Sequence, residues 1–509
     1  MYIEKKKIAG KKYNYLKISV RFKDNVTTKT VAYLGSGDMS KEELNKAIAK
    51  IPKSKIESIK KEAVEKLKTR EVKEKEVKKE KETGAKPGAI VSIKTDGREI
   101  KGTLLPSFDP AVLLLKLESG YNIGIDKNKI KSIKKISEAK AVEFPSLEIK
   151  QKEDKPGISV IATGGTIASR LDYATGAVKW LMTPQQLFFL APKLFDIVKI
   201  NKIARPFMIG SENMSPQYWQ IIAREAALLL NKKENNGIII THGTDTLHYT
   251  AAALSFMLRN LNKPVVFTYS QRSTDRGSTD TVLNLTCSAY AALSNIAEVM
   301  LVGHATESDN YCIAIRGTKA RKMNSSRRDT FRPINELPIA KMSEDGKIDI
   351  INENFKKRNN KKVIADTKFD EGVALIKYYP GAKPDIIEYF VKKGFKGIII
   401  EAVGLGHVAT EESMCNWLPT LKKAIDSGVV ICFAPQTLYG RLDPYVYATG
   451  RKLLDIGILY LEDMLPEVAY VKLGWVLGHE KKPEKIKELM LTNIAGEFNK
   501  KISIETFLY

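Results

Sequence analysis

From Gly157 onward the sequence alternates short apolar runs with stretches of helical composition, and this alternation most restricts what the chain can fold into. The apolar runs are ISVIAT, GIIITHG, VVFTYS, EVMLVG and CIAIRG. Short, continuously apolar strands separated by helices are typical of a parallel sheet that is covered on both faces. The sequence therefore predicts a doubly wound α/β domain over residues 156–350.

The same alternation resumes after Phe369. Its apolar runs are GVALIKYYPG, GIIIEAVG and VVICFAPQ, and helical stretches such as DIIEYFVKKG lie between them. This pattern predicts a second, smaller α/β lobe over residues 368–509.

Residues 86–138 have a different pattern, because five short segments alternate polar and apolar residues with no helical stretch between them. Asp96-Gly97 lies between the first two segments and is a strong hairpin signal. Five short strands within about fifty residues favour a small β-barrel.

Residues 1–83 form a basic N-terminal extension. Two strands are expected between Tyr13 and Leu34, where YNYLKISVRF and TTKTVAYL flank a polar turn. Ser40 then precedes a helical run, and Glu43 follows it at the spacing of a capping box. The stretch from 61 to 81 consists mostly of Lys and Glu, so a charged helix or linker with little to bury is expected.

The charge of the chain is concentrated in this extension. The formal net charge is +24, and residues 1–86 hold 25 Lys+Arg against 13 Asp+Glu. A basic arm of this kind fits a polyanion such as RNA. A solvated, highly charged helix that only keeps the chain in solution explains the composition equally well, so both interpretations stay open.

Several classes of protein are disfavoured by composition. No run of about 18 uncharged apolar residues occurs, which argues against a membrane span, and no apolar segment follows the basic residues at the N-terminus, which argues against a secretory signal. The four cysteines have no metal-site spacing and are expected to be buried thiols: Cys287, Cys312, Cys415 and Cys432. A cytoplasmic protein without a metal site is expected.

The first motif that carries chemistry is ISVIATGGTIASR, residues 158–170. An apolar strand runs directly into Thr163-Gly164-Gly165-Thr166, and paired glycines allow a sharp turn and a close backbone approach to a ligand. Strand ends of this kind open the binding site of a doubly wound sheet. The hydroxyl of Thr166 can attack a carbonyl there if its proton is removed. On its own, a strand followed by two glycines is more often only a tight turn.

The second motif is GIIITHGTDTLHYTA, residues 237–251, in which another buried strand ends beside Thr244 and Asp245. A hydroxyl next to a carboxylate at a strand end can relay a proton or hold a substrate ammonium group. His242 and His248 flank the pair, and we interpret both as ordinary hydrogen-bonding residues.

The third motif is RGTKARKMNSSRRDTF, residues 316–331, which is rich in hydroxyls and cations. A buried lysine amine can act as a base, and Lys322 is the candidate. Taken alone, the motif is better explained as a basic surface loop.

Together, ATGGTIA, THGTDT and a lysine before an N-S-S…TF run occur in an order that resembles the bacterial-type L-asparaginase family, over about residues 158–477. The resemblance implies an asparaginase-like fold in which Thr166 is the nucleophile. It also implies that Thr244 and Lys322 remove the proton of Thr166, while Asp245 orients Lys322 and helps to hold the substrate amine. Backbone N–H groups and a threonine hydroxyl are then expected to face the oxyanion.

The same resemblance implies the residues that bind substrate. Tyr173, in LDYATGAV, is the candidate for the tyrosine of the lid over the nucleophile. Ser211 and Glu212, in SENMSP, are the candidates for the pair that holds the substrate α-carboxylate and α-amine.

Four further segments are similar to the D subunit of archaeal-type glutamyl-tRNA(Gln) amidotransferases, over roughly residues 86–509. These are SRLDYATGAV, IGSENMSP, SQRSTDRGSTD and GRLDPYVYATGRKLLDIGILYLEDMLPEVAYVKLGWVLG. This resemblance implies that L-glutamine is hydrolysed and that ammonia passes to an E subunit, which uses ATP and Mg²⁺ to amidate Glu-tRNA(Gln). It further implies no cofactor in this chain and an assembly that is either a heterodimer or a heterotetramer, the latter built on a homodimeric core.

Two alternatives compete with this interpretation. A free-standing L-asparaginase or glutaminase would share the catalytic set but would need neither the barrel nor the GRLDPYVYATGR segment. A catalytically silent RNA-binding scaffold would fit the basic arm but not four intact catalytic positions. The sequence also departs from the family pattern, because Ala402 and Val403 stand where a Gly-Thr pair is expected. Residues 1–83 lie outside the resemblance, and the preference between glutamine and asparagine stays open.

Overall fold

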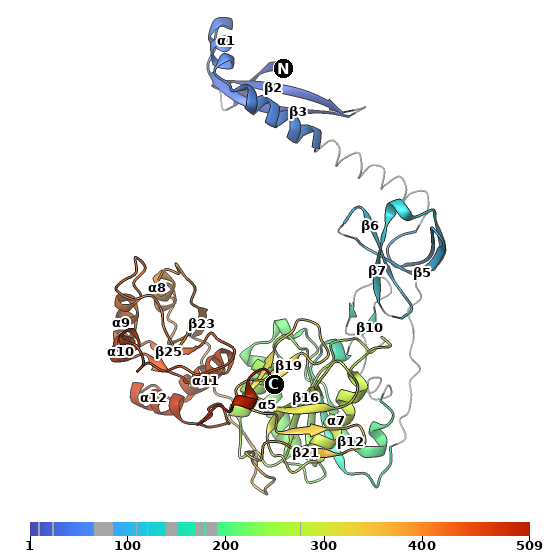
Figure 1. The fold of residues 1–509 in the computed structure, drawn as a ribbon, viewed down its shortest axis with the longest axis vertical. Helices are drawn as coiled ribbons and strands as arrows, with labels where there is room; N and C mark the ends of the chain where they lie inside the picture. Colours follow the sequence, from blue (N-terminus) through green and yellow to red (C-terminus); the bar gives the residue numbers. More distant parts are fainter. Residues whose placement is uncertain are drawn as a thin grey trace. The chain divides into compact units, whose positions relative to one another are not determined.

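The structure is a computed structural model of the 509-residue chain. It describes all residues except 9–10, 23–24, 66–84, 108, 120, 139–150, 169, 172–177, 180–190 and 275. The chain divides into two compact units, one formed mainly by residues 1–141 and the other by most of the chain that follows (Figure 1). In the described part of the chain, no helix is both long and apolar enough to cross a membrane.

The larger unit is built around an eight-stranded sheet of order β12-β9-β13-β15-β16-β17-β20-β21. The first five strands are parallel: β12 (Lys199–Ala204), β9 (Gly157–Ala162), β13 (Ile238–Thr241), β15 (Val265–Thr268) and β16 (Val299–His304). Three antiparallel strands complete the sheet: β17 (Cys312–Arg316), β20 (Ala340–Met342) and β21 (Ile348–Ile350). This mixed sheet is the doubly wound fold that the sequence predicts, with one edge reversed.

The reversal begins at the run CIAIRG, which the sequence placed among the strands of a parallel sheet. In the structure, β17 pairs antiparallel with β16, with Met300 opposite Arg316 and His304 opposite Cys312. Only residues 305–311 separate the two strands, and a parallel crossover needs a dozen residues or more. The short connection therefore fixes the antiparallel direction.

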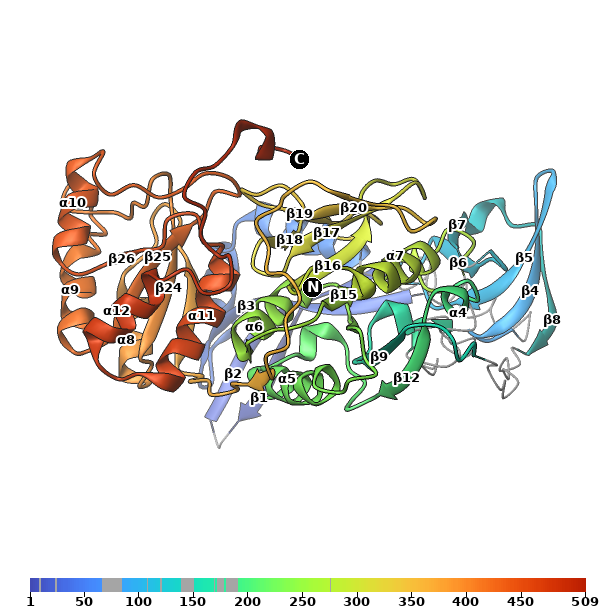
Figure 2. The same cartoon turned by 90° about the horizontal axis from the view of Figure 1, so that it is seen from below.

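Helices cover both faces of this sheet, as Figure 2 shows. On one face α5 (Pro216–Leu230) and α6 (Leu247–Met257) pack against Ile238 and Ile240 of β13. On the other face α7 (Thr281–Leu293) and α4 (Leu194–Ile197) pack against Ile239. Because consecutive strand residues point to opposite faces, one isoleucine run supplies both cores.

The second lobe has a parallel four-stranded sheet of order β23-β24-β25-β26. Its strands are β23 (Val373–Lys377), β24 (Gly397–Ala402), β25 (Val430–Pro435) and β26 (Leu459–Tyr460). Residues of α8 (Asp385–Lys392), α9 (Leu418–Asp426) and α10 (Ala448–Asp455) share one apolar core with the sheet. The helix α11 (Pro466–His479) is almost wholly buried, because it packs against both the sheet and α6 of the first lobe; α12 (Pro483–Leu491) follows it.

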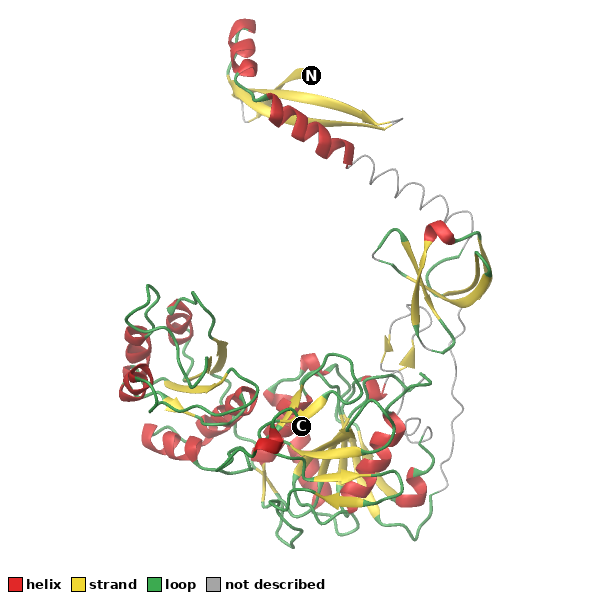
Figure 3. Ribbon diagram, in the orientation of Figure 1, coloured by secondary structure: helices red, strands yellow, loops and turns green. Residues whose placement is uncertain are grey.

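The smaller unit contains two antiparallel sheets, coloured yellow in Figure 3. One has five strands in the order β7-β6-β5-β4-β8, namely β4 (Ala89–Thr95), β5 (Arg98–Leu105), β6 (Val112–Lys116), β7 (Asn122–Asp126) and β8 (Ser132–Glu138). The hairpin at Asp96-Gly97 is confirmed, since Thr95 pairs with Arg98 and Gly97 has a φ of 82°. The five expected strands are therefore present.

The other sheet has three strands, β1 (Tyr2–Ile8), β2 (Lys11–Phe22) and β3 (Asn25–Ser36). Only two were expected, because the lysine-rich start of the chain has no strand pattern of its own and forms β1 by pairing with β2. The predicted capping box is confirmed at α1 (Lys41–Ala49), where Ser40 and Glu43 bond to each other's backbone N–H. Residues 53–65 are also helical, whereas most of the Lys- and Glu-rich stretch lies outside the described residues.

Candidate active site

The TGGT turn follows β9 and lies against two other backbone segments, at Ile209 and at Gly243. Gly164 and Gly165 have φ values of 118° and 83°. A Cβ atom on Gly165 would lie 2.4 Å from the Cα of Gly243, and one on Gly164 would lie 2.2 Å from the carbonyl oxygen of Ile209. Both positions therefore need glycine for conformation and for space. Thr166, half-buried, then starts a single 3₁₀ turn, Thr166–Ala168.

The neighbouring strand β13 delivers the second motif to the same edge. The Thr163 hydroxyl donates to the carbonyl of Thr241 at 2.9 Å, which joins the two strand ends directly. Thr244 is buried, whereas the side chain of Asp245 is 63% exposed. The threonine is thus held against the fold, and the carboxylate faces outward.

Lys322 connects these two residues. It ends β18 (Ala320–Lys322), which pairs antiparallel with β19 (Phe331–Pro333). Its Nζ donates to the hydroxyl of Thr244 at 2.9 Å and to the carboxylate of Asp245 at 2.7 Å. The side chain of Lys322 is only 12% exposed. A buried amine in contact with a hydroxyl is the arrangement that a proton relay requires.

Ser211 and Glu212 follow β12 in the short turn Ser211–Asn213. The buried Ser211 hydroxyl accepts the backbone N–H of Asp245 at 3.1 Å, and the Ser211 carbonyl accepts the hydroxyl of Thr246 at 2.6 Å. Glu212 is exposed, and its carboxylate accepts a hydrogen bond from the side-chain amide of Asn213 at 3.3 Å. Ser211 is therefore fixed beside Asp245, and Glu212 is free to meet a ligand from solvent.

Four of the seven residues singled out in the sequence are thus connected by hydrogen bonds, namely Thr244, Asp245, Lys322 and Ser211. The turn that carries Thr166 packs against Gly243 beside them. Asp245, Lys322 and Ser325 help to line a pocket of about 350 Å³. Tyr173 lies outside the described residues. A larger cavity of about 960 Å³ lies in the second lobe, lined among others by Arg441, Tyr445 and Glu462, and none of the seven residues lines it.

The departure at Ala402 and Val403 lies at the end of β24. The carbonyl of the buried Ala402 accepts the backbone N–H of Gln436 at 3.0 Å. The N–H of Val403 donates to the carbonyl of His407 at 3.1 Å, which closes a tight turn through Gly404, whose φ is 53°. These contacts are made by the backbone and are open to many side chains.

Both histidines of the second motif are buried. The Nδ1–H of His242 donates to the carbonyl of Gly243 at 2.7 Å, and its Nε2 lies 3.0 Å from the Thr250 hydroxyl. Burial lowers the pKa of His242 to about 4. Burial, together with the positive charges of Arg321 and Lys322, lowers the pKa of His248 to about 3. His242 is therefore the hydrogen-bonding residue that the sequence predicts, whereas the buried Nδ1 of His248 has no hydrogen-bond partner among the described residues.

A buried charged cluster behind Lys322 was not predicted from the sequence. Glu467, near the start of α11, lies 3.5 Å from Arg321 and 3.6 Å from His248. Burial raises the pKa of Glu467, and burial likewise raises the pKa of Glu401 at the end of β24. Glu467 is 145 residues from Lys322, and the segment that begins GRLDPYVYATGR and contains it gives no local sign of this contact. The packing of α11 against α6 brings it there.

A second anchor holds the strand that carries Lys322. Lys319 is fully buried, and its Nζ donates to the carboxylate of Asp463 at 2.8 Å and to the carbonyl of Glu497 at 2.9 Å. The Thr318 hydroxyl donates to the carbonyl of Ala495 at 3.0 Å. The C-terminal segment of the chain therefore fixes the base of β18 from the second lobe.

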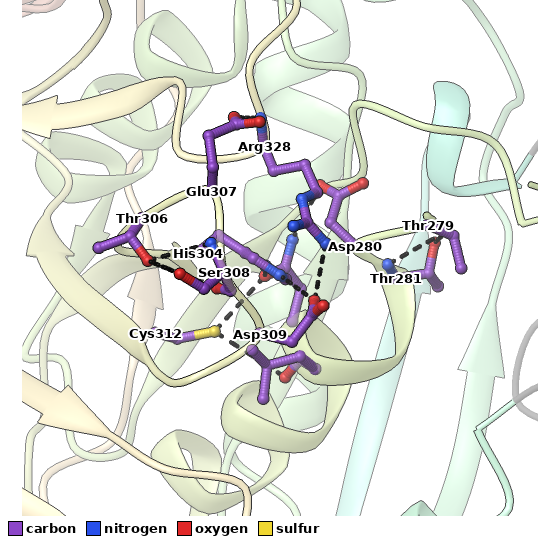
Figure 4. A network of polar contacts seen from close by, with 12 residues as sticks. Thr279, Asp280, Thr281, His304, Thr306, Glu307, Ser308, Asp309, Cys312 and Arg328 are labelled. Carbon is purple, nitrogen blue, oxygen red and sulfur yellow. Dashed lines mark hydrogen bonds and ion pairs between the residues drawn. The ribbon is translucent and has the colours of Figure 1, made fainter. Parts of the chain in front are cut away.

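Figure 4 shows another polar network that the sequence did not reveal. His304 lies between the side-chain oxygens of Asn284, at 2.6 Å, and Asp309, at 2.9 Å, and Arg328 donates to Asp309 at 2.8 Å. Burial opposes ionisation of Asp309, but the hydrogen bonds from His304 and Arg328 hold its pKa below the ordinary value. The network joins the loop after β16 to the segment that follows Lys322.

Asp280, at the start of α7, fixes the SQRSTDRGSTD segment in a similar way. Its carboxylate accepts the hydroxyl of Ser270 at 2.8 Å and the backbone N–H groups of Gln271 and Arg272 at 3.0 Å each. Because Asp280 is fully buried, these bonds hold residues 270–272, directly after β15, against the start of α7.

Comparison with family models gives three matches along the chain. The model for asparaginase, N-terminal, matches residues 157–356, and the model for the glutaminase/asparaginase C-terminal domain matches residues 372–490. The GatD N-terminal domain matches residues 85–136. Among the described residues, no group of three or more His, Cys, Asp or Glu side chains is arranged to hold a metal ion.

The chain is similar to several glutamyl-tRNA(Gln) amidotransferase D subunits. It is 48% identical to that of Thermococcus kodakarensis over 426 residues, covering 82% of this chain and 95% of the relative. It is also 48% identical to that of Pyrococcus furiosus over 438 residues, covering 84% of this chain and 98% of the relative. The relative from Methanothermobacter thermautotrophicus is 45% identical over 425 residues, covering 82% and 95%.

Two solved L-asparaginases share part of the fold. The thermostable enzyme from Thermococcus kodakarensis superposes with a TM-score of 0.61 at 28% identity, covering 68% of this chain and 100% of its own. L-asparaginase I from Vibrio cholerae gives a TM-score of 0.57 at 28% identity, covering 68% of this chain and 99% of its own. These proteins are matched over their whole length, while about a third of this chain lies outside the match.

Proposed function

Because the chain belongs to the family of glutamyl-tRNA(Gln) amidotransferase D subunits, we propose that it releases ammonia from glutamine as the amidase component of a tRNA-dependent amidotransferase. One observation carries the chemical part of the proposal. Lys322 reaches both Thr244 and Asp245 from a strand about 77 positions away in the sequence. In a chain of this family, that contact supplies a base beside the turn that presents Thr166.

In the proposed reaction, Thr166 Oγ attacks the side-chain carbonyl carbon of glutamine, and its proton passes through Thr244 towards Lys322. The new C–O bond gives a tetrahedral oxyanion, which backbone N–H groups and a threonine hydroxyl stabilise. The C–N bond then breaks, and the departing nitrogen takes up the proton and leaves as ammonia. Water hydrolyses the remaining ester, which returns Thr166 and releases glutamate.

The substrate is held by residues on either side of this centre. Ser211 and Glu212 bind the α-carboxylate and α-amine, and Asp245 contributes to binding the amine. The position of Asp245 supports this role, since its carboxylate is anchored by Lys322 yet remains open to solvent. Tyr173 is proposed as the lid residue over Thr166.

The chain works with a partner subunit, because a D subunit is one component of an amidotransferase. We propose that this partner is an E-type subunit that uses ATP and Mg²⁺ to activate Glu-tRNA(Gln), and that two D chains form the core of a heterotetramer. The proposed location is the cytoplasm, where aminoacyl-tRNA is used. The proposed division of the chain is 1–83, 86–138, 156–350 and 368–509.

The main rival is a free-standing L-asparaginase or glutaminase. Coverage favours the amidotransferase, because the matched L-asparaginase covers 68% of this chain and the D subunit relative covers 82%. Residues 85–136 in addition match the GatD N-terminal domain. An enzyme that acts alone would have no need of that domain.

Ammonia release by the intact chain tests the proposal. It is measured with glutamine and with asparagine, first alone and then with an E-type subunit and Glu-tRNA(Gln). We expect glutamine hydrolysis to rise when partner and charged tRNA are both present. Rapid asparagine hydrolysis that ignores the tRNA would establish the free-standing asparaginase instead.

A further inference from the structure

The three-stranded sheet of residues 1–36 has two very different faces. Leu16, Ile18 and Val31 point to one face and pack with Leu44 and Ile59 of the helical segments that follow. Side chains on strands alternate between faces, so the neighbouring residues point the opposite way. We call that opposite side the open face; it comprises Tyr2, Glu4, Lys6, Tyr13, Tyr15, Lys17, Ser19, Arg21, Thr28, Thr30 and Tyr33.

Tyrosines occupy the centre of the open face. Tyr15 lies directly opposite Tyr33, with ring centroids 5.5 Å apart, and Tyr13 lies 6.2 Å from Tyr33. Tyr33 is 53% exposed and Tyr2 is 47% exposed. Four aromatic rings on a solvated face contribute little to the stability of the sheet, because much of their area stays in water.

Cations surround these rings. In the strand register, Lys6 is opposite Tyr13 and Lys17 is opposite Tyr2. Arg21 continues the same face along β2 and is exposed. Glu4 is the acidic residue of the face. Its carboxylate lies 2.9 Å from the Nζ of Lys17 and 3.7 Å from the Nζ of Lys6. The open face therefore combines exposed rings with a net positive charge.

We propose that the open face of this sheet binds unpaired nucleotides of an RNA; that this RNA is a tRNA rests on the proposed function. Bases stack on exposed aromatic rings whatever their sequence, and nearby cations meet the phosphates. A protein partner would be expected to bind a continuous apolar surface or a purely basic one. Here exposed rings alternate with cations on a sheet, so the rings can stack on bases while the cations contact phosphates. The binding site lies outside the amidase machinery and adds a contact for RNA on this chain.

The ring contribution is tested with the full-length chain and a labelled 12-nucleotide oligouridylate. Tyr2→Ser and Tyr33→Ser remove exposed rings and leave the helix-covered face intact. Their combination is expected to weaken binding at least about tenfold, as expected for loss of stacking. Tyr389→Ser is the matched control, since Tyr389 is also 53% exposed but lies on α8; it is expected to stay within about twofold.

The charge contribution is tested by a salt series on the same complex. Arg21→Glu is expected to lower the slope of log affinity against log salt concentration by about one, as for a lost phosphate contact. Lys233→Glu, a change of an exposed lysine in the other unit, is expected to leave the slope unchanged. Duplex RNA of the same length is expected to compete poorly, because its bases are already stacked.

Three outcomes would overturn the inference. These are no binding of oligouridylate by the wild-type chain, unchanged binding by Tyr2→Ser/Tyr33→Ser, or loss of E-subunit binding by that variant with RNA binding intact. Ammonia release from glutamine is measured in parallel. If the chain binds RNA but releases no ammonia, the proposed function fails and the inference about the open face stands. If the chain releases ammonia but does not bind RNA, only the inference fails.

Discussion

The amidase centre and the open face are both assembled from the ends or surfaces of β-strands, but they are held in different ways. At the amidase centre, buried side chains are fixed by one another and by backbone groups, as in the contacts of Lys322 with Thr244 and of Ser211 with the N–H of Asp245. On the open face, exposed rings are placed only by the strand register. Bond-making chemistry requires the first kind of site, because small displacements cost rate. RNA binding that tolerates many sequences needs only the second kind of site, in which the strand register places exposed side chains.

Removal of one fixed contact at the amidase centre is expected to have the largest effect. Lys322→Met deletes the amine that touches both Thr244 and Asp245. Loss of a general base lowers turnover by about 10²–10⁴-fold, so we expect kcat for glutamine hydrolysis to fall in this range with the fold intact. Lys347→Met, at an exposed lysine, is the control. A fall of less than tenfold would show that Lys322 is not the base.

The anchor beneath Lys322 should matter more for stability than any surface pair. Asp463→Asn leaves the fully buried Lys319 without its carboxylate, and breaking a buried ion pair costs about 3–5 kcal/mol. All four tryptophans lie beyond residue 178, so urea unfolding followed by tryptophan fluorescence reports on this unit alone. Asp196→Asn breaks the exposed pair with Lys152 and is expected to leave the midpoint unchanged. Equal effects of the two variants would contradict the comparison.

The pH dependence of stability tests the burial of His242. Its pKa falls from the ordinary 6.5 to about 4 on folding because of burial. Between these values the unfolded chain binds a proton that the folded chain does not, so stability falls as the pH drops. From pH 7 to pH 5 the loss from this residue is about 2 kcal/mol. His242→Gln is expected to reduce the loss by that amount. An unchanged pH dependence would show that folding does not lower the pKa of His242.

The smallest effect is expected in the N-terminal region. Ser40→Ala removes the capping box of α1, which costs about 1 kcal/mol and should speed hydrogen exchange of the α1 amides only. Ser215→Ala at the start of α5 is the control, since Ser215 makes no side-chain capping bond. Glutamine hydrolysis is expected to be unchanged in both variants. If Ser40→Ala slowed it, the two regions would not be independent.

The parts of this molecule that follow local rules were predictable from the sequence. Apolar runs located the strands of both α/β lobes, Asp96-Gly97 located a hairpin, and Ser40 with Glu43 located a helix start. Thr244, Asp245 and Lys322 were named from motifs, and their mutual contacts are what the structure adds. Their catalytic roles, and those of Thr166, Tyr173, Ser211 and Glu212, remain predictions.

The parts that depend on distant pairing were not predictable. The strand β1 forms because β2 offers an edge, not because its lysines favour a strand. The antiparallel direction of β17 depends on the length of a connection, and the burial of Lys319 and Glu467 depends on α11 and the C-terminal segment. A lysine in a basic motif gives no local sign that a carboxylate 144 positions away will pair with it.

In the proposed function, Thr166 of this chain releases the ammonia that a partner transfers to tRNA. The most direct test is to assemble the wild-type chain or its Thr166→Ala variant with an E-type subunit, ATP, Mg²⁺ and Glu-tRNA(Gln), and to measure Gln-tRNA(Gln) with glutamine or ammonium chloride as nitrogen donor. We expect the Thr166→Ala variant to form no Gln-tRNA(Gln) with glutamine but to match the wild type with ammonium. Transfer from glutamine at the wild-type rate by Thr166→Ala would contradict it.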